Sequence, residues 1–258
     1  MTPKILITND DGIHAEGIKY LINALKTKAE LTVVAPAHDQ SGVGLSISLR
    51  GKLKAQKMDL FPEAQAFSVT GTPADCVKMG LKIMMKSPPD LILSGINCGS
   101  NHGRTILYSG TCGGVIEGIF QGVPGIAFSC YDVEEPSYHL LEPYVPQIMD
   151  YVLKNPLPSG TLLNVNFPSN EVLKGTGPQG IKLTRQGRQY WHSFPKQHSE
   201  DCYVLDFELP PPQFHESEDS DVFWLDRGYI TCVPVHVDEL TDWRYLNARK
   251  DNFDKFFA

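Results

Sequence analysis

Two adjacent carboxylates, Asp10 and Asp11, follow a short apolar run near the start of the chain (KILIT, residues 4–8). Acidic side chains held together repel each other and raise each other's pKa unless a cation or hydrogen bonds offset the repulsion. Mg²⁺ and Mn²⁺ bind through one or two carboxylates together with neutral oxygens and water. The pair is therefore a candidate half of a metal site. The alternative is that one aspartate caps a helix beginning near Glu16 while the other faces solvent.

Neutral oxygen donors that could complete such a site follow two later apolar runs. Ser41 lies in the loop APAHDQSGVG, and Asn97 lies two residues beyond the Ser-Gly pair of DLILSGIN. A serine beside a glycine is also typical of a simple turn, and a buried asparagine often only holds a loop in place. Both residues become stronger metal-ligand candidates in combination with the acidic pair.

An anion site is indicated by YSGT, residues 108–111, which precedes the helical pattern TCGGVIEGIFQG. Free N–H groups and hydroxyls at a helix N-terminus bind phosphate, so Ser109, Gly110 and Thr111 are candidates for that role. Plain N-capping by one of the two hydroxyls explains the same residues without a ligand. Together with the acidic pair, the motif suggests a phosphate that faces a metal ion.

The stretch GTPADCV, residues 71–77, has a structural explanation. Thr72 as N-cap, Pro73 at the first helical position and Asp75 at the third predict a helix start.

The elements that must position these residues alternate between strand-like apolar runs and segments of helical period, from KILIT to LLEPYVPQIMDYVLK. This alternation predicts a doubly wound α/β fold with a mostly parallel sheet, in which ligands lie beyond the carboxyl ends of the strands. Residues 1–170 are expected to form the α/β core that carries the metal site. Residues 171–258 are expected to be β-rich, with QYWHSF and DCYVLDFEL as a hairpin, and to contribute to the core edge and to oligomer contacts within one structural unit.

Composition limits the partners and the compartment. The formal charge is −7 and no basic run occurs, so duplex nucleic acid and anionic membranes are unexpected partners. The six cysteines form no CxxC pair, no apolar run is long enough to span a bilayer, and the N-terminus lacks a secretion signal. These features predict reduced thiols and a cytoplasmic location.

The motifs occur together, in the same order, in a known family. The chain resembles the survival protein E (SurE) family of metal-dependent 5'/3'-nucleotidases over nearly its full length. The resemblance lies in ILITNDDGIHAEGI, VVAPAHDQSGVGLSIS, VTGTPADCV, DLILSGINCGSN, YSGT, LLNVNFP, TRQGRQY and GYITCVPVHVDELTD.

The resemblance implies a Rossmann-like core, a homodimer or homotetramer, and one Mg²⁺ or Mn²⁺ ion per subunit. It assigns Asp10, Asp11, Ser41 and Asn97 as metal ligands, the two aspartates also as catalytic residues, and Asn97, Ser109, Gly110 and Thr111 as phosphate-binding residues.

The implied reaction is hydrolysis of nucleoside 5'- and 3'-monophosphates, a phosphoric monoester hydrolase activity of the EC 3.1.3.5 type, which extends to short polyphosphate in some members. Water is expected to attack phosphorus in line while Asp10 or Asp11 orients or deprotonates it; the sequence does not distinguish the two aspartates.

Two stretches depart from the family pattern. Gly103, Arg104 and Thr105 stand where members commonly carry acidic residues, which places positive charge beside the expected phosphate loop. In the helix after YSGT, Gly113 and Gly114 stand where alanine is common, and each lowers helix propensity by up to about 1 kcal/mol relative to alanine. Substrate preference and the rigidity of this helix are the properties that these departures affect.

Other classes of protein also place acids after a first strand. A haloacid dehalogenase phosphatase would need a nucleophilic aspartate where this chain has Asn9, and an amide cannot form an acyl phosphate. A receiver domain would need a phosphate-accepting aspartate after a later strand and about half this length. A nucleotide-binding regulator without turnover stays open as the alternative function.

Overall fold

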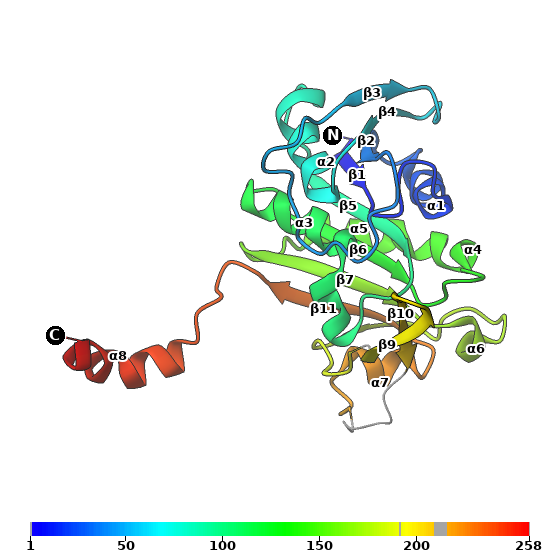
Figure 1. Cartoon of the computed structure of the whole chain (residues 1–258). Coiled ribbons are helices and arrows are strands. Elements are labelled where there is room, and N and C mark those ends of the chain that lie inside the picture. The colour runs from blue at the N-terminus through cyan, green and yellow to red at the C-terminus, as the bar shows by residue number, and fades with distance from the viewer. Residues whose placement is uncertain (1, 191, 209–215, 258) are drawn as a thin grey trace.

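A nine-stranded mixed sheet forms the centre of the molecule (Figure 1). The computed structural model describes residues 2–190, 192–208 and 216–257. In spatial order the strands are β3 (Ala55–Met58), β4 (Ala64–Val69), β2 (Glu30–Pro36), β1 (Lys4–Thr8), β5 (Leu91–Cys98), β6 (Gly125–Cys130), β7 (Thr161–Phe167), β11 (Ile230–His236) and β8 (Ile181–Leu183). The strands from β4 through β7 are parallel, while β3 and β11 run antiparallel to their neighbours β4 and β7.

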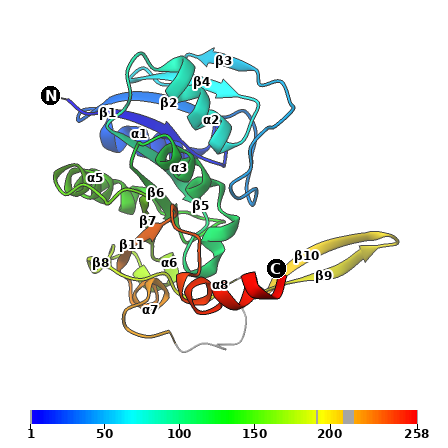
Figure 2. The same ribbon diagram turned by 90° about the vertical axis from the view of Figure 1, so that its left-hand side faces the viewer.

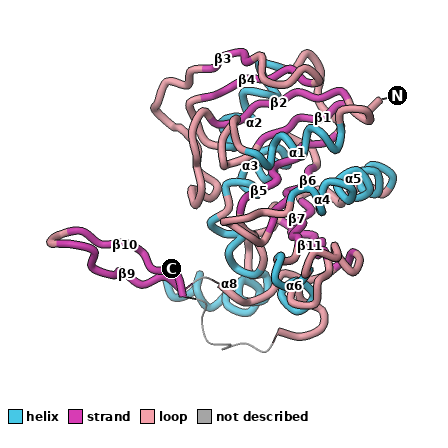
Figure 3. The backbone as a smooth tube through the Cα atoms, turned by 90° about the vertical axis from the view of Figure 1, so that its right-hand side faces the viewer, coloured by secondary structure: helices cyan, strands magenta, loops and turns pink. Residues whose placement is uncertain are grey.

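Helices cover both faces of this sheet, as Figure 3 shows with helices in cyan and strands in magenta. One face carries α1 (Glu16–Leu25), α4 (Tyr138–Leu141) and α5 (Val145–Lys154), and the other carries α2 (Pro73–Met79) and α3 (Gly110–Phe120). The shorter or outlying helical segments are η1 (Gly80–Met84), η2 (Gly103–Tyr108), η3 (Glu142–Tyr144), α6 (Asn170–Leu173), α7 (Asp221–Leu225) and α8 (Trp243–Phe257). The doubly wound α/β fold is therefore confirmed.

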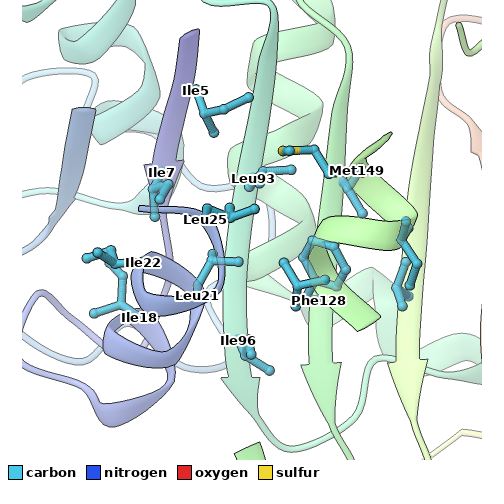
Figure 4. Packing of buried hydrophobic residues seen from close by; sticks show 14 of the residues in the cluster. Ile5, Ile7, Ile18, Leu21, Ile22, Leu25, Leu93, Ile96, Phe128 and Met149 are labelled. Carbon is cyan, nitrogen blue, oxygen red and sulfur yellow. The ribbon is translucent and has the colours of Figure 1, made fainter. Parts of the chain in front are cut away.

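The core divides between the two faces because side chains alternate along a buried strand. In β1, Ile5 and Ile7 belong to the cluster beneath α1 and α5, whereas Leu6 packs on the α2 side. Figure 4 shows the first cluster, in which Leu21 of α1 and Phe128 of β6 are among the buried side chains. This packing fixes the ends of the strands, where the candidate site lies.

The order of the strands reverses between β1 and β5. From β1 the chain proceeds outward through β2 to β4, and then returns to the other side of β1 for β5, β6 and β7. In such sheets ligands bind where the order reverses, beyond the carboxyl ends of the strands. Asp10 and Asp11 follow β1, and Asn97 lies near the end of β5, so the three residues lie at this switch point.

The C-terminal part adds β8 and β11 to the edge of the sheet and places other elements outside it. The hairpin of β9 (His192–Ser199) and β10 (Cys202–Glu208) is confirmed as a separate antiparallel pair, which projects from the body in Figure 2. Trp191, which was expected in this hairpin, lies outside the described residues. The helix α8 stands clear of the sheet in Figure 1 and has no buried residue.

Three local expectations are also met. Thr72 caps α2 in a capping box with Asp75, and Pro73 occupies the first turn. All six cysteines are unpaired. Among the described residues, no helix combines the length and apolarity needed to cross a bilayer.

Candidate metal and phosphate site

Asp10 lies buried at the end of β1, with only 3% of its surface exposed. Its Oδ1 accepts a hydrogen bond of 2.7 Å from the hydroxyl of Thr111, the second residue of α3. Burial raises the pKa of Asp10 to about 6, although the bonds from the hydroxyl and backbone of Thr111 act in the opposite direction. The carboxylate thus lies at the N-terminus of a helix, where negative charge is stabilised.

Asp11 is less buried than Asp10 and links the end of β1 to β5 through a hydrogen bond. Its Oδ2 accepts a hydrogen bond of 3.1 Å from the backbone N–H of Cys98, the residue after Asn97. Burial, followed by the charge of Asp10, raises the pKa of Asp11 to about 7. In the part of the chain that the structure describes, neither aspartate forms an ion pair with a lysine or arginine. A buried and a partly buried carboxylate without a compensating charge fit a site for a cation.

The helix-capping alternative for the acidic pair is wrong. The N-cap of α1 is Ala15, and no side chain forms a cap hydrogen bond there. Asp10 and Asp11 instead make the contacts with α3 and β5 just described.

Of the two neutral ligand candidates, Asn97 is the next-to-last residue of β5 and Ser41 lies in the loop after β2. The amide nitrogen of Asn97 donates a hydrogen bond to the carbonyl of Gly99 at 2.6 Å. The amide oxygen of Asn97 is then available to coordinate a cation. The loop of Ser41 is attached through the neighbouring Gln40, whose N–H donates to the carbonyl of Asp10 at 2.7 Å. The hydroxyl of Ser41 itself donates to Asp39 at 2.6 Å.

The chemistry of this donor set fits a hard cation. Carboxylate, hydroxyl and amide oxygens suit Mg²⁺ and Mn²⁺, whereas thiolate and imidazole ligands suit softer metals. No three His, Cys, Asp or Glu side chains of the described residues are arranged as a metal site. A cation here would therefore bind through the two aspartates and neutral oxygens.

The expected phosphate motif is at the N-terminus of α3, facing the acidic turn. Ser109 is the N-cap, and its Oγ accepts from the N–H of Cys112 at 3.0 Å, so its own hydrogen remains available for donation. Gly110 packs directly on Asp10, since a Cβ at Gly110 would lie 2.8 Å from the Cβ of Asp10. The sequence motif therefore both caps the helix and adjoins the carboxylates.

Thr111 has a contact that its sequence motif did not indicate. Its hydroxyl is buried, donates to Asp10, and accepts from the amide of Asn101 at 3.3 Å. The same amide donates to Ser129 of β6 at 2.8 Å. A buried chain of hydrogen bonds thus holds one oxygen of Asp10 in a fixed orientation, and the Thr111 hydroxyl is committed to it.

Replacing Thr111 by valine, which keeps its shape but removes the hydroxyl, is expected to weaken Mn²⁺ binding about tenfold or more, because partners that orient a metal ligand have effects of this size. Isothermal titration calorimetry of the metal-free protein measures the change. The Thr111→Ser variant keeps the hydroxyl and should bind nearly as well as the unmodified protein. Unchanged affinity in Thr111→Val would contradict the orienting role.

Known proteins resemble this chain in sequence and in fold. The family model described as survival protein SurE matches residues 5–193. The chain belongs to the SurE family. A protein of Protochlamydia amoebophila named 5'-nucleotidase SurE is 47% identical, with 98% of each chain covered, and one of Thermosipho melanesiensis with the same name is 43% identical, with 97% of each covered. The crystal structure of the SurE protein from Aquifex aeolicus has a TM-score of 0.82 and 34% identity, and covers 98% of this chain and 100% of that chain.

The glycines that depart from the SurE pattern have a packing reason. A Cβ at Gly113 would lie 2.8 Å from the backbone oxygen of Gly44, in the loop of Ser41. At Gly114 a Cβ would lie 3.0 Å from the methyl of Thr8 and 3.3 Å from Pro73. Glycine is thus found where α3 closely approaches the loop of Ser41, the end of β1 and the start of α2.

Gly113→Ala is expected to lower the free energy of unfolding by about 1–2 kcal/mol, since overpacking against backbone outweighs the gain in helix propensity. The loop that carries Ser41 should also shift, so phosphate release should fall. Thermal unfolding and phosphate release measure the two effects. A higher unfolding temperature with full activity would contradict this prediction, because it would show that the loop of Ser41 accommodates the added methyl group without loss of packing.

The other departure, at residues 103–105, lies at the start of η2, which is hydrogen-bonded to the C-terminal part. The N–H of Gly103 donates to the buried carboxylate of Asp221 at 3.0 Å, and the N–H of Arg104 donates to the carbonyl of Gln189 at 2.6 Å. The side chain of Arg104 is exposed and has no ion-pair partner among the described residues. It therefore extends into solvent near the start of the segment that leads to Ser109.

Arg185, in the TRQGRQY stretch, could cover a nucleotide base or pack against the protein; it forms ion pairs with Glu216 at 3.4 Å and Asp219 at 2.9 Å. These contacts favour the structural interpretation.

Sequence reasoning missed Asp39, which accepts two hydrogen bonds from Ser41. The available signal was its spacing, because an aspartate two residues before a serine is well placed to accept from that residue's N–H.

Proposed function

We propose that the protein is a metal-dependent 5'-nucleotidase that also hydrolyses nucleoside 3'-monophosphates and short polyphosphate. The observation that carries the proposal is the pair of buried Asp10 and partly buried Asp11, without a cationic partner in the described structure, beside the N-terminus of α3. The relatives named 5'-nucleotidase SurE support the same activity.

The residues that would hold the cation, Mg²⁺ or Mn²⁺ at one per subunit, are Asp10, Asp11, Ser41 and Asn97. Their oxygens form a hard donor set at the switch point of the sheet. When bound, the cation would neutralise charge on the phosphoryl group and lower the pKa of water.

In this proposal Ser109, Gly110 and Asn97 would bind the phosphate. The Ser109 hydroxyl lies at the N-terminus of α3, where the first N–H groups of a helix lack intrahelical acceptors. Thr111 would contribute chiefly through Asp10, because its hydroxyl already donates to that carboxylate. Arg104 adds positive charge nearby, which would favour the more highly charged polyphosphate.

Asp11 is the better of the two aspartates to orient or deprotonate the attacking water. Asp10 is 3% exposed, and one of its carboxylate oxygens accepts a hydrogen bond from Thr111. Asp11 is only partly buried and accepts one hydrogen bond, from the N–H of Cys98. A general base must reach its proton within about 3 Å, which an accessible carboxylate does more readily.

The C-terminal part supports a homodimer or homotetramer. Trp243, Tyr245, Phe253, Phe256 and Phe257 of α8 are all more than half exposed on a helix without buried residues. Several large apolar side chains exposed on one helix often mark a surface that a partner covers. We place the assembly in the cytoplasm, which the six unpaired cysteines favour.

The test is phosphate release from a panel of nucleoside 5'- and 3'-monophosphates and short polyphosphate, with Mg²⁺, with Mn²⁺ and with EDTA. Release that requires the metal is expected, with 5'-monophosphates as substrates. Binding of nucleotide and metal without release from any substrate would instead support a nucleotide-binding regulator.

A further inference from the structure

Asp39 makes two hydrogen bonds to one of the proposed metal ligands. One oxygen of its carboxylate, Oδ1, accepts from the backbone N–H of Ser41 at 2.8 Å and from the hydroxyl of Ser41 at 2.6 Å. Both donors of Ser41 are thus used by the same acceptor. The lone pairs of the Ser41 hydroxyl oxygen are left for another contact.

A serine hydroxyl binds a cation only through its oxygen, so its hydrogen must point away from the ion. A free hydroxyl rotates and must be fixed in one orientation when it binds. A carboxylate that accepts the hydrogen removes this freedom and increases the electron density on the oxygen, as the outer partners of metal-bound histidines do. Asp39 is placed to act in this way on Ser41.

The loop around Asp39 is attached to the acidic turn itself. Gln40, between Asp39 and Ser41, donates its N–H to the carbonyl of Asp10 at 2.7 Å. The negative charge of Asp39 acts on both Asp10 and Asp11, and Asp39 forms no ion pair within the described part of the chain. A carboxylate in this place adds to the unfavourable charge of the metal-free site and favours a bound cation.

We propose that Asp39 is a positioning residue that accepts the hydroxyl hydrogen of Ser41 and thereby turns the oxygen of Ser41 toward the cation. This inference rests on the proposed metal site. The competing explanation is that Asp39 only stabilises the loop backbone through the N–H of Ser41. The two explanations differ in whether the effect of Asp39 on metal affinity requires the hydroxyl of Ser41.

The experiment is calorimetric titration of the metal-free full-length protein with Mn²⁺. Asp39→Ala, which removes both charge and acceptor, is expected to weaken binding about 10- to 100-fold. Asp39→Asn removes the charge but keeps an acceptor oxygen, so a loss of only about threefold is expected. In a Ser41→Ala background the two Asp39 variants should have the same affinity, because no hydroxyl remains to be oriented.

Two control variants separate orientation from loop anchoring and from surface charge. Ser48 attaches the same loop to Asp75 through bonds of 3.0 and 2.7 Å, so Ser48→Ala loosens the loop without touching Ser41. Asp59→Asn removes an exposed charge directly after β3, which runs antiparallel to β4, so that Asp59 lies toward the amino ends of the parallel strands and away from the site. Both controls should keep the Mn²⁺ affinity within about threefold of the unmodified protein.

Each outcome decides between the explanations. Equal affinities of Asp39→Ala and Asp39→Asn in the presence of Ser41, or an equal loss in Ser48→Ala, would overturn the positioning role. Absence of Mn²⁺ binding in the unmodified protein would instead overturn the proposed metal site. A difference between the Asp39 variants that disappears with Ser41→Ala would establish the role.

Discussion

The Asp11→Asn variant should lose metal-dependent phosphate release by about 10³-fold or more, because it removes both a proposed metal ligand and the more accessible candidate base. Asparagine keeps the size of the side chain and can still accept from the N–H of Cys98. The loss would therefore arise from the missing charge and basicity. Release of phosphate from nucleoside monophosphates with Mn²⁺ measures the effect.

The same variant is expected to be more stable than the unmodified protein when both are metal-free. Burial and the charge of Asp10 raise the pKa of Asp11 from 3.8 to about 7, so ionisation of Asp11 disfavours the folded state. Asparagine removes this penalty, and at pH 8 the free energy of unfolding should rise by about 2 kcal/mol. Activity and stability would then change in opposite directions.

The stability of the metal-free protein is expected to decrease as the pH rises. Between about pH 4 and pH 7 the folded metal-free protein retains a proton on Asp11 that the unfolded chain has lost. The free energy of unfolding therefore includes a favourable contribution from Asp11 at low pH. This contribution decreases as the pH rises from about 4 to about 7 and is absent above about pH 7. Denaturant unfolding in EDTA at pH 5, 6, 7 and 8 should therefore show a shallower decrease for Asp11→Asn than for the unmodified protein. Parallel profiles would exclude a raised pKa at Asp11.

Gly110→Ala is the second variant with a large expected effect. The new Cβ would lie 2.8 Å from the Cβ of Asp10 and 2.9 Å from its Oδ2, closer than normal van der Waals contact. Asp10 must then move, and displacement of a catalytic group by about 1 Å lowers rates by about 100-fold. We expect losses of this order in phosphate release, and weaker Mn²⁺ binding in calorimetry.

A matched control is available for this substitution. At Gly51 a Cβ would meet no atom within 4 Å, so Gly51→Ala should leave Mn²⁺ affinity and phosphate release unchanged. If Gly110→Ala behaves like Gly51→Ala, Asp10 does not contribute to the site in the orientation described here.

The sequence was sufficient for the fold class and for the identity of most candidate residues. The hydrophobic periods of the α/β core are local properties: apolar residues recur every two residues in a strand and every three to four residues in a helix. The capping box at Thr72 and Asp75 is equally local, since both partners lie within one turn of α2. Such features are readable from a single sequence because they depend on few neighbours.

The placement of the acidic pair beyond the first strand could also be predicted, but the contacts of the pair could not. The bond from Thr111 to Asp10 joins residues 101 positions apart, and the bond from Cys98 to Asp11 joins residues 87 positions apart. Both depend on the order of β1, β5 and β6 in the sheet, which the local pattern leaves open.

By itself, then, the sequence determined which oxygen donors and hydroxyls exist and that they follow strands or begin a helix. Only the tertiary structure decided that Thr111 serves Asp10, that Asp39 holds the hydroxyl of Ser41, and that Gly113 leaves room for the backbone of Gly44. The physical reason is range: hydrogen-bond partners and close backbone approaches are set by how whole elements pack, and a change of a few tenths of an ångström there decides whether a side chain fits.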